Sequence, residues 1–135
     1  MGRSDLHLLF LEGDSGYGPT LSAAAQAAGL DGRLRLVRTP QEALDSDTGW
    51  GAPAILLIDL SNGSGLALLE HLKQFPELRK RVTIGLVPPR DGATTARAYE
   101  LGVRSCLERP DTPEEQMEFF RSLRQYWELN EPNNL

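Results

Sequence analysis

Short apolar runs alternate along the chain with segments whose apolar residues recur at helical spacing. The longest of these runs covers residues 54–58, ends in Asp59, and is followed by a Ser-Asn-Gly-Ser-Gly stretch with the composition of a loop. A short apolar run bounded by turn residues is typical of a strand that is buried on both faces of a parallel sheet. The second run begins by alternating apolar and charged residues, which indicates a strand nearer an edge of the sheet. We expect strands at residues 7–11, 33–38, 54–60, 82–87 and 105–107.

The segments between these runs carry helix start and stop signals. Thr39 and Thr112 are each followed by proline and, three residues on, by glutamate, which predicts two helices that begin with a capping box. Gly29 and Gly102 are placed to end two other helices. We expect the helix after Thr39 to be short and to fail within residues 45–49. The predicted helices begin near residues 19–20, 39, 66, 92 and 112, and the third ends near residues 75–76.

Five strands that alternate with five helices predict repeated βα units and a parallel sheet. Right-handed crossovers favour the doubly wound, flavodoxin-like strand order 2-1-3-4-5, although the pattern alone leaves an open sheet of another order possible. The 135 residues fit one α/β domain, with a core over about 5–128 and a polar tail at 129–135.

Carboxylates follow two strands that this order makes neighbours. Glu12 and Asp14 come after the first strand and Asp59 ends the third, so we expect them to converge at one edge of the sheet. Such a cluster suits a divalent cation such as Mg²⁺. Without a cation these carboxylates repel one another, and Arg109 at the end of the fifth strand is the candidate basic partner. In the alternative interpretation Asp14 and Asp59 merely cap local structure and Glu12 is solvated.

The charge balance and the cysteine content narrow the class of protein. The chain has 14 Lys and Arg against 19 Asp and Glu, a net charge of -5, which argues against a dedicated nucleic-acid binder. Its one cysteine, Cys106, excludes an internal disulfide and indicates a reducing compartment. No apolar stretch has the length of a membrane span, so we expect a cytoplasmic protein without membrane contact.

Two further features remain open. The glycine-rich loop at residues 13–18 could cradle a phosphate or a flavin, but it lacks the lysine of a P-loop and the spacing of a dinucleotide fingerprint. The aromatic residues of the last helix exceed what one core face needs, and part of this group is a candidate partner interface: Phe119, Phe120, Tyr126 and Trp127.

Four segments, taken in order, resemble the receiver domain of two-component response regulators. They are Leu-Phe-Leu-Glu at 9–12, Ile-Leu-Leu-Ile-Asp-Leu at 55–60, Ala-Tyr-Glu-Leu-Gly at 98–102 and Leu-Glu-Arg-Pro at 107–110. The pair Tyr126-Trp127 near the end is similar to the single-domain regulators that partner phytochrome-type histidine kinases. In that family an aspartate at the end of strand three accepts a phosphoryl group from a kinase histidine, which implies Asp59 as the phosphoacceptor. Glu12 matches the first of two acidic residues that help to hold Mg²⁺.

The chain departs from the family pattern at four other positions. Gly13 stands at the second acidic position, with Asp14 displaced by one residue, and Val87 stands where the family has a serine or threonine. Arg109 replaces the lysine and Cys106 replaces the aromatic switch residue. Loss of the carboxylate at Gly13 weakens Mg²⁺ binding, and the valine methyl groups cannot hydrogen-bond a phosphoryl oxygen. We therefore expect Arg109 to pair with Asp59 and to mimic part of the charge balance of an activated receiver.

The leading hypothesis is a degenerate receiver, not an enzyme, that acts by protein–protein contact, with phosphorylation of Asp59 absent or inefficient. The resemblance implies a histidine kinase or another signalling protein as partner, and a homodimer through the fourth and fifth helices, with Tyr99, Phe119, Tyr126 and Trp127 as interface candidates. One alternative is a working phosphoacceptor in which Asp14 serves as a metal ligand. The other is a flavodoxin-like small-ligand binder or enzyme that uses the loop at residues 13–18.

Overall fold

The computed structural model describes residues 7–12, 16–30, 33–50, 55–61 and 63–130. Within these ranges the side chains of residues 47–50, 63 and 128–130 are not described. Two residues of the expected site, Gly13 and Asp14, lie outside the described residues, as does Ala54 at the start of the longest apolar run.

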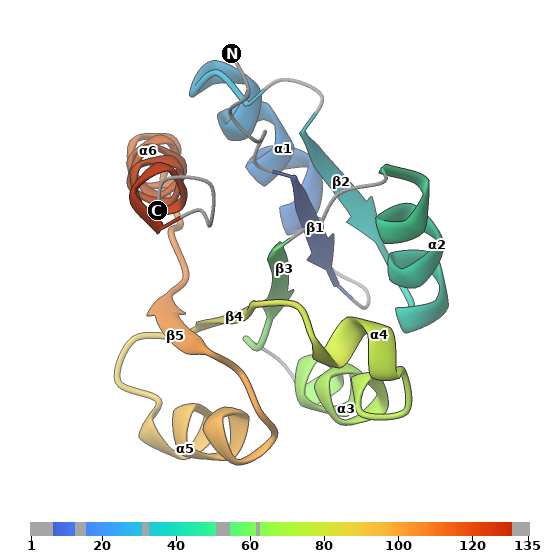
Figure 1. The fold of residues 1–135 in the computed structure, drawn as a ribbon. Helices are drawn as coiled ribbons and strands as arrows, with labels where there is room; N and C mark the ends of the chain where they lie inside the picture. Colours follow the sequence, from blue (N-terminus) through green and yellow to red (C-terminus); the bar gives the residue numbers. More distant parts are fainter. Residues whose placement is uncertain (1–6, 13–15, 31–32, 51–54, 62, 131–135) are drawn as a thin grey trace.

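Five parallel strands form one sheet in the order β2-β1-β3-β4-β5, which confirms the predicted flavodoxin-like architecture (Figure 1). In the register of the central strands Leu11 lies opposite Ile58, and Asp59 lies opposite Leu86. The second strand is an edge strand and is mostly exposed, as its alternating pattern indicated. The strands are β1 (Leu8–Leu11), β2 (Leu34–Val37), β3 (Ile55–Asp59), β4 (Thr83–Val87) and β5 (Ser105–Glu108).

Helices cover both faces of the sheet (Figure 1). The core on one face joins Leu9 and Leu11 to buried residues of α2, α3, α4 and α5, whereas the core on the other joins Leu8 and Phe10 to α1 and α6. This division follows from the pleat, since successive residues of β1 point to opposite faces. The helices are α1 (Tyr17–Ala27), α2 (Pro40–Trp50), α3 (Gly63–Leu72), α4 (Pro76–Arg79), α5 (Gly92–Glu100) and α6 (Pro113–Asn130).

The predicted helix signals are present in the structure. Thr39 Oγ1 accepts a hydrogen bond from the backbone N–H of Glu42 at 3.1 Å, and Thr112 Oγ1 accepts one from that of Glu115, also at 3.1 Å. The second box is reciprocal, because Glu115 Oε1 accepts from the Thr112 N–H at 3.3 Å. The two stop glycines that follow α1 and α5 have φ values of +91° and +103°, a region that favours glycine.

Four helix boundaries were predicted wrongly. The second helix does not fail within residues 45–49 but continues to Trp50, because the fully buried Ala43 anchors it against the core despite its poor helix formers. The first helix begins at Tyr17, before the proline taken as its start. The third begins at Gly63, inside the stretch predicted as a loop, and ends at Leu72 instead of near residues 75–76. The short α4 follows it, so the described residues form six helices and not the predicted five.

Gly65 explains how the third helix can begin so close to the strand. A Cβ at this position would overlap the backbone oxygen of Asp59 and would lie 2.9 Å from Cα of Leu60. Only glycine therefore allows α3 to pack directly on the end of β3. This contact fixes the backbone that carries the Asp59 side chain.

Candidate functional site

Asp59 lies at the carboxyl end of β3 and is almost completely buried, with 3% of its surface exposed. Its Oδ1 atom accepts a hydrogen bond from the backbone N–H of Ser61 at 3.0 Å. A buried carboxylate needs more than one hydrogen bond to offset the loss of its hydration. The remaining compensation comes from a cation.

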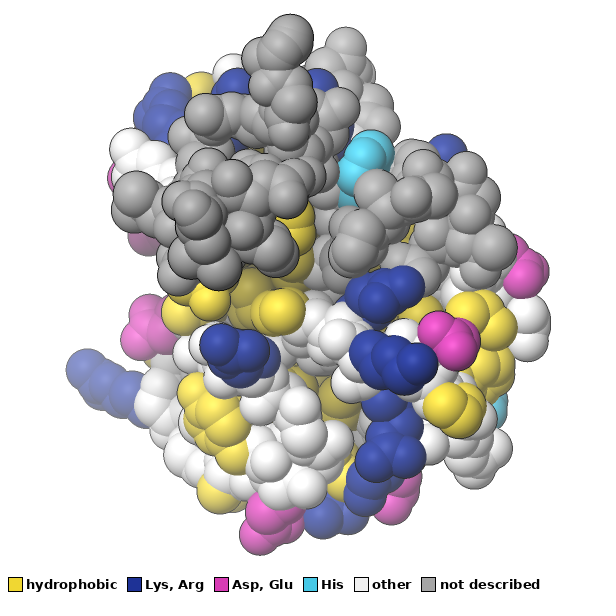
Figure 2. Space-filling view, in the orientation of Figure 1, with side chains coloured by type: hydrophobic (Ala, Val, Ile, Leu, Met, Phe, Trp, Pro, Cys, Tyr) yellow, Lys and Arg dark blue, Asp and Glu magenta, His cyan; other side chains and the backbone are white. Residues whose placement is uncertain are grey.

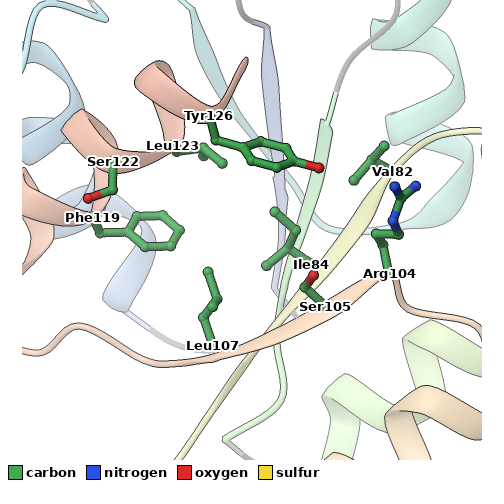
Figure 3. A pocket seen from close by; sticks show the side chains of 9 residues that line it. All are labelled: Val82, Ile84, Arg104, Ser105, Leu107, Phe119, Ser122, Leu123 and Tyr126. Carbon is green, nitrogen blue, oxygen red and sulfur yellow. The ribbon is translucent and has the colours of Figure 1, made fainter. Parts of the chain in front are cut away.

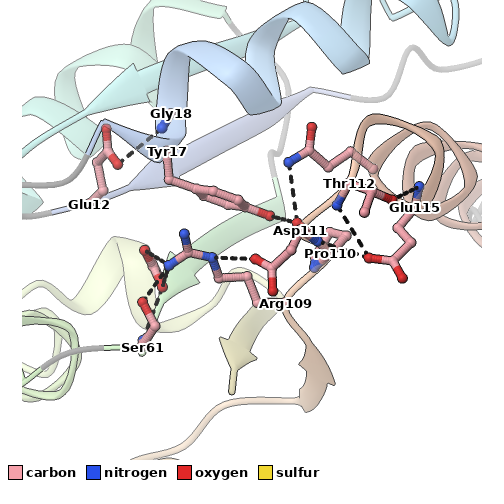
Figure 4. Close-up of polar contacts among 11 residues, drawn as sticks. Glu12, Tyr17, Gly18, Ser61, Arg109, Pro110, Asp111, Thr112 and Glu115 are labelled. Carbon is pink, nitrogen blue, oxygen red and sulfur yellow. Dashed lines mark hydrogen bonds and ion pairs between the residues drawn. The ribbon is translucent and has the colours of Figure 1, made fainter. Parts of the chain in front are cut away.

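Arg109, directly after β5, provides this cation. Its Nη1 atom lies 3.1 Å from Asp59 Oδ2 and 3.4 Å from Oδ1, and it also donates to Ser61 Oγ at 2.5 Å (Figure 4). The expected Arg109–Asp59 pair is therefore present. One guanidinium nitrogen, Nη1, makes both contacts with the carboxylate. The pair is therefore not the bidentate form, in which two guanidinium nitrogens each bind one carboxylate oxygen. The backbone N–H of Arg109 bonds to the Val87 carbonyl at 2.8 Å, which places the guanidinium beside the ends of β3 and β4.

Two further groups hold the Arg109 guanidinium. The ring of Tyr17 lies against it, with 3.7 Å between Cζ and the ring centroid, and Nε is 3.3 Å from Asp111 Oδ1 (Figure 4). The Tyr17 hydroxyl donates to the carbonyl of Pro110, so the ring is itself anchored to the turn between β5 and α6. Burial raises the pKa of Tyr17 to about 12, which keeps its hydroxyl protonated as a donor. Sequence reasoning missed Tyr17, because nothing local to it indicates a contact 92 residues away.

Glu12, at the end of β1, is also buried, with 8% of its surface exposed. Its Oε1 atom accepts from the backbone N–H of Gly18 at 3.2 Å. A Cβ on Gly18 would lie 2.5 Å from Glu12 Oε2, so a side chain at this position would displace the Glu12 carboxylate. Burial is the main cause that raises the pKa of Glu12, and the nearby charge of Asp59 raises it further. The Gly18 hydrogen bond and the charges of Arg38 and Arg109 oppose this shift.

The positions that depart from the receiver pattern have different surroundings. Val87 ends β4 with 5% exposure, and its side chain offers no hydrogen bond to the pocket. Cys106 lies on the face of the sheet that α5 covers, where it packs against the core that includes α5. Burial raises the pKa of the Cys106 thiol, and its backbone N–H donates to Tyr99 Oη at 3.1 Å. Neither residue supplies a mobile hydroxyl or a large ring near Asp59.

The described residues do not by themselves make a site for a divalent cation. Within the described ranges, no group of three or more His, Cys, Asp or Glu side chains could hold a metal ion. Glu12 and Asp59 do face the same edge of the sheet, as predicted. However, Arg109 already lies against Asp59, and the Gly18 N–H holds Glu12. The third expected carboxylate, Asp14, is outside the described residues.

The candidate interface residues fall into two pairs. Tyr99 on α5 and Tyr126 on α6 are exposed, at 49% and 43%. Phe119 and Trp127 are half-buried and pack against the core between α6 and the sheet. No helix in the part of the chain that the structure describes is long and apolar enough to cross a membrane.

The strand order defines a doubly wound α/β protein with two buried carboxylates, Glu12 and Asp59, at the β1–β3 switch point. No protein-family model and no curated protein sequence matches the chain. Solved structures do match it. The response regulator RPA3017, described in red light signalling of R. palustris, is 26% identical, with 90% of this chain and 94% of that chain covered and a TM-score of 0.68.

Two other matches agree with this one. A response regulator receiver domain from Rhodospirillum rubrum is 19% identical, with coverage of 92% and 94% and a TM-score of 0.68. The Mn²⁺-bound form of the response regulator Rcp1 is 18% identical, with coverage of 92% and 96% and a TM-score of 0.63. The chain has the fold of a response regulator receiver domain.

Proposed function

We propose that the protein is an atypical receiver of two-component signalling that acts by protein–protein contact, with phosphorylation of Asp59 absent or inefficient. The observation that carries this proposal is the Arg109 guanidinium against Asp59, with Nη1 3.1 Å from Oδ2. A permanent cation there takes the place that a metal ion or an ammonium group takes in a working phosphoacceptor. On this proposal Mg²⁺ binds weakly at most.

The chemistry of phosphoryl transfer supports this proposal. Transfer depends on positioning and on cations that neutralise the charge developing on the phosphoryl oxygens. An incoming phosphoryl group must reach an oxygen of Asp59 that Arg109 now contacts, and the neighbouring Val87 offers it no hydrogen bond. Arg109 is also held by Ser61, Tyr17 and Asp111, so moving it breaks four contacts at once.

We further propose that the partner is a signalling protein, either a histidine kinase of the phytochrome type or a component of a similar pathway. The similarity to RPA3017, a regulator in red light signalling, supports this choice. The surface that includes α5 and α6 would carry the contact, with Tyr99 and Tyr126 as exposed anchors, and would also serve a homodimer. Exposed tyrosines are typical anchors of such interfaces.

Intact mass spectrometry after incubation with Mg²⁺ and acetyl phosphate tests the proposal. We expect no phosphoryl adduct on the wild-type chain. An adduct that is present in the wild type and absent from Asp59→Asn would overturn the proposal in favour of a working phosphoacceptor.

A gain-of-function variant makes a negative result informative. Arg109→Lys combined with Val87→Thr restores the two side chains of the family pattern, and threonine has nearly the shape of valine. We expect this double variant to form an adduct that Asp59→Asn abolishes. If the wild type stays unmodified and the double variant does too, the block lies elsewhere than at Arg109 and Val87, and the assignment of the defect to these two residues is wrong.

A further inference from the structure

The face of the sheet beneath α6 contains an apolar cavity that the Asp59 site does not use. The cavity has a volume of about 230 Å³ and lies between α6 and the strands β4 and β5 (Figure 3). It exists because α6 packs along α1, whereas its approach to β5 is much slighter. Leu107 of β5 is left 41% exposed as a result.

The walls of the cavity are mostly apolar, and two of them are aromatic. Ile84 and Leu107 come from the two strands, and Phe119 and Leu123 come from α6. Tyr126 lies across the cavity with its hydroxyl toward the side on which Val82 and Arg104 lie (Figure 3). Flat rings on two sides favour an aromatic ligand over an alkyl chain of equal size.

One end of the cavity is polar and positively charged. Arg104 and Ser105 line this end, where β5 begins. Arg104 is exposed, and its side chain makes no ion pair with the other described residues. Figure 2 shows other Lys and Arg side chains gathered over α3 and α4, which cover the other face of the sheet from the cavity. Arg104 therefore places one positive charge at this end of the cavity, although the whole chain has a net charge of -5.

We propose that this cavity binds a small aromatic carboxylate, with the ring between Phe119 and Tyr126 and the carboxylate toward Arg104. The planar guanidinium matches the geometry of a carboxylate. At roughly 30 Å³ for each water-sized group, a cavity of about 230 Å³ holds about eight such groups, which is the size of a single ring with one substituent. The proposal does not rest on the function proposed for Asp59.

Titration of the full chain with benzoate, followed by ¹H–¹⁵N NMR, tests the proposal, with benzamide as a neutral ligand of the same shape. We expect saturable shifts of the Ser105, Leu107 and Ser122 amides, with a dissociation constant of about 1 mM or below. Arg104→Gln should weaken benzoate about tenfold and leave benzamide unchanged, since only the anion uses the guanidinium. Arg79→Gln, which changes an exposed arginine of α4 outside the cavity, is the matched control and should change the binding of neither ligand.

A second variant tests the location. Ser122 is an exposed residue of α6 that lines the cavity, so Ser122→Phe should fill the cavity without disturbing the fold and should abolish binding of both ligands. The proposal is overturned if benzoate does not saturate, if Arg104→Gln affects benzoate no more than benzamide, or if the shifts lie around Asp59. It is also overturned if sedimentation shows a dimer that Ser122→Phe disrupts and that benzoate cannot enter, because a second copy would then fill the cavity.

Discussion

Replacing Arg109 by methionine tests whether the ion pair with Asp59 stabilises the fold. Methionine keeps an unbranched apolar stem that can lie on the Tyr17 ring, so the substitution removes the charge and retains much of the packing. The Asp59 side chain is 2% exposed, against 23% for Arg109. Removing Arg109 therefore leaves a buried carboxylate without its counter-charge. Among the described residues, the variant leaves the buried carboxylate with one remaining hydrogen bond, from the Ser61 N–H.

The expected magnitude follows from this asymmetry. Removing one partner of a buried ion pair costs about 3–5 kcal/mol. We expect a loss near the lower limit, about 3 kcal/mol, because Asp59 lies at the carboxyl end of its strand and keeps one hydrogen bond. Asp59→Asn should cost less, about 1–2 kcal/mol, since the amide oxygen still accepts from Ser61 and Arg109 remains next to Asp111.

Urea unfolding followed by circular dichroism gives the four free energies of the cycle: wild type, two single variants and the double variant. The double variant should lose less than the sum of the single losses, by about 1–3 kcal/mol, because either single change already removes the pair. Arg121→Met is the control, since Arg121 pairs with Glu118 on the surface at 3.7 Å and should change stability by less than about 0.5 kcal/mol. Additivity of the two site variants within about 0.5 kcal/mol would refute a direct interaction between Arg109 and Asp59.

Three further predictions concern single residues. Gly65→Ala should lower the free energy of unfolding by at least about 2 kcal/mol through its clash with Asp59, whereas Gly92→Ala, with open space around it, should change it by less than about 1 kcal/mol in urea melts. Asp91→Ala removes the cap that accepts the Thr94 N–H at 3.0 Å and should cost about 1 kcal/mol; no change in the melt would contradict the capping role. The raised pKa of Glu12 means that the folded protein binds this proton more tightly than the unfolded chain does, which stabilises the fold. This stabilisation is present below the ordinary pKa of 4.5 and is lost as the pH rises through the folded-state pKa. Glu12→Gln should remove this loss in pH-dependent melts, and parallel curves for the wild type and the variant would contradict the prediction.

The sheet could be predicted because its signals are local. Buried parallel strands appear as unbroken apolar runs, and strand order follows from connection rules that need no side-chain detail. The boundaries that failed were decided by tertiary contacts. Ala43 holds α2 in place beyond its weak helix formers, and Gly65 admits α3 against the Asp59 backbone. Neither contact leaves a pattern in the neighbouring sequence.

The candidate site was predictable only in part, for a similar reason. The end of a strand fixes where a side chain starts, so Glu12, Asp59 and Arg109 could be assigned to one edge of the sheet. What the guanidinium touches depends on residues from other elements. Tyr17 of α1 stacks on Arg109 and hydrogen-bonds the turn after it, and a contact between such distant residues has no short-range signature.

The connections of Arg109 bear on how an atypical receiver would signal. One guanidinium joins three elements, since it contacts Asp59 at the end of β3, Tyr17 on α1 and Asp111 before α6. A ligand or modification shifts a conformational equilibrium only by as much as it favours one state over the other. With these contacts made in the resting protein, a second state at the end of β5 must replace all three. The proposed function therefore assigns signalling to surfaces that are permanently displayed, such as those that include Tyr99 and Tyr126.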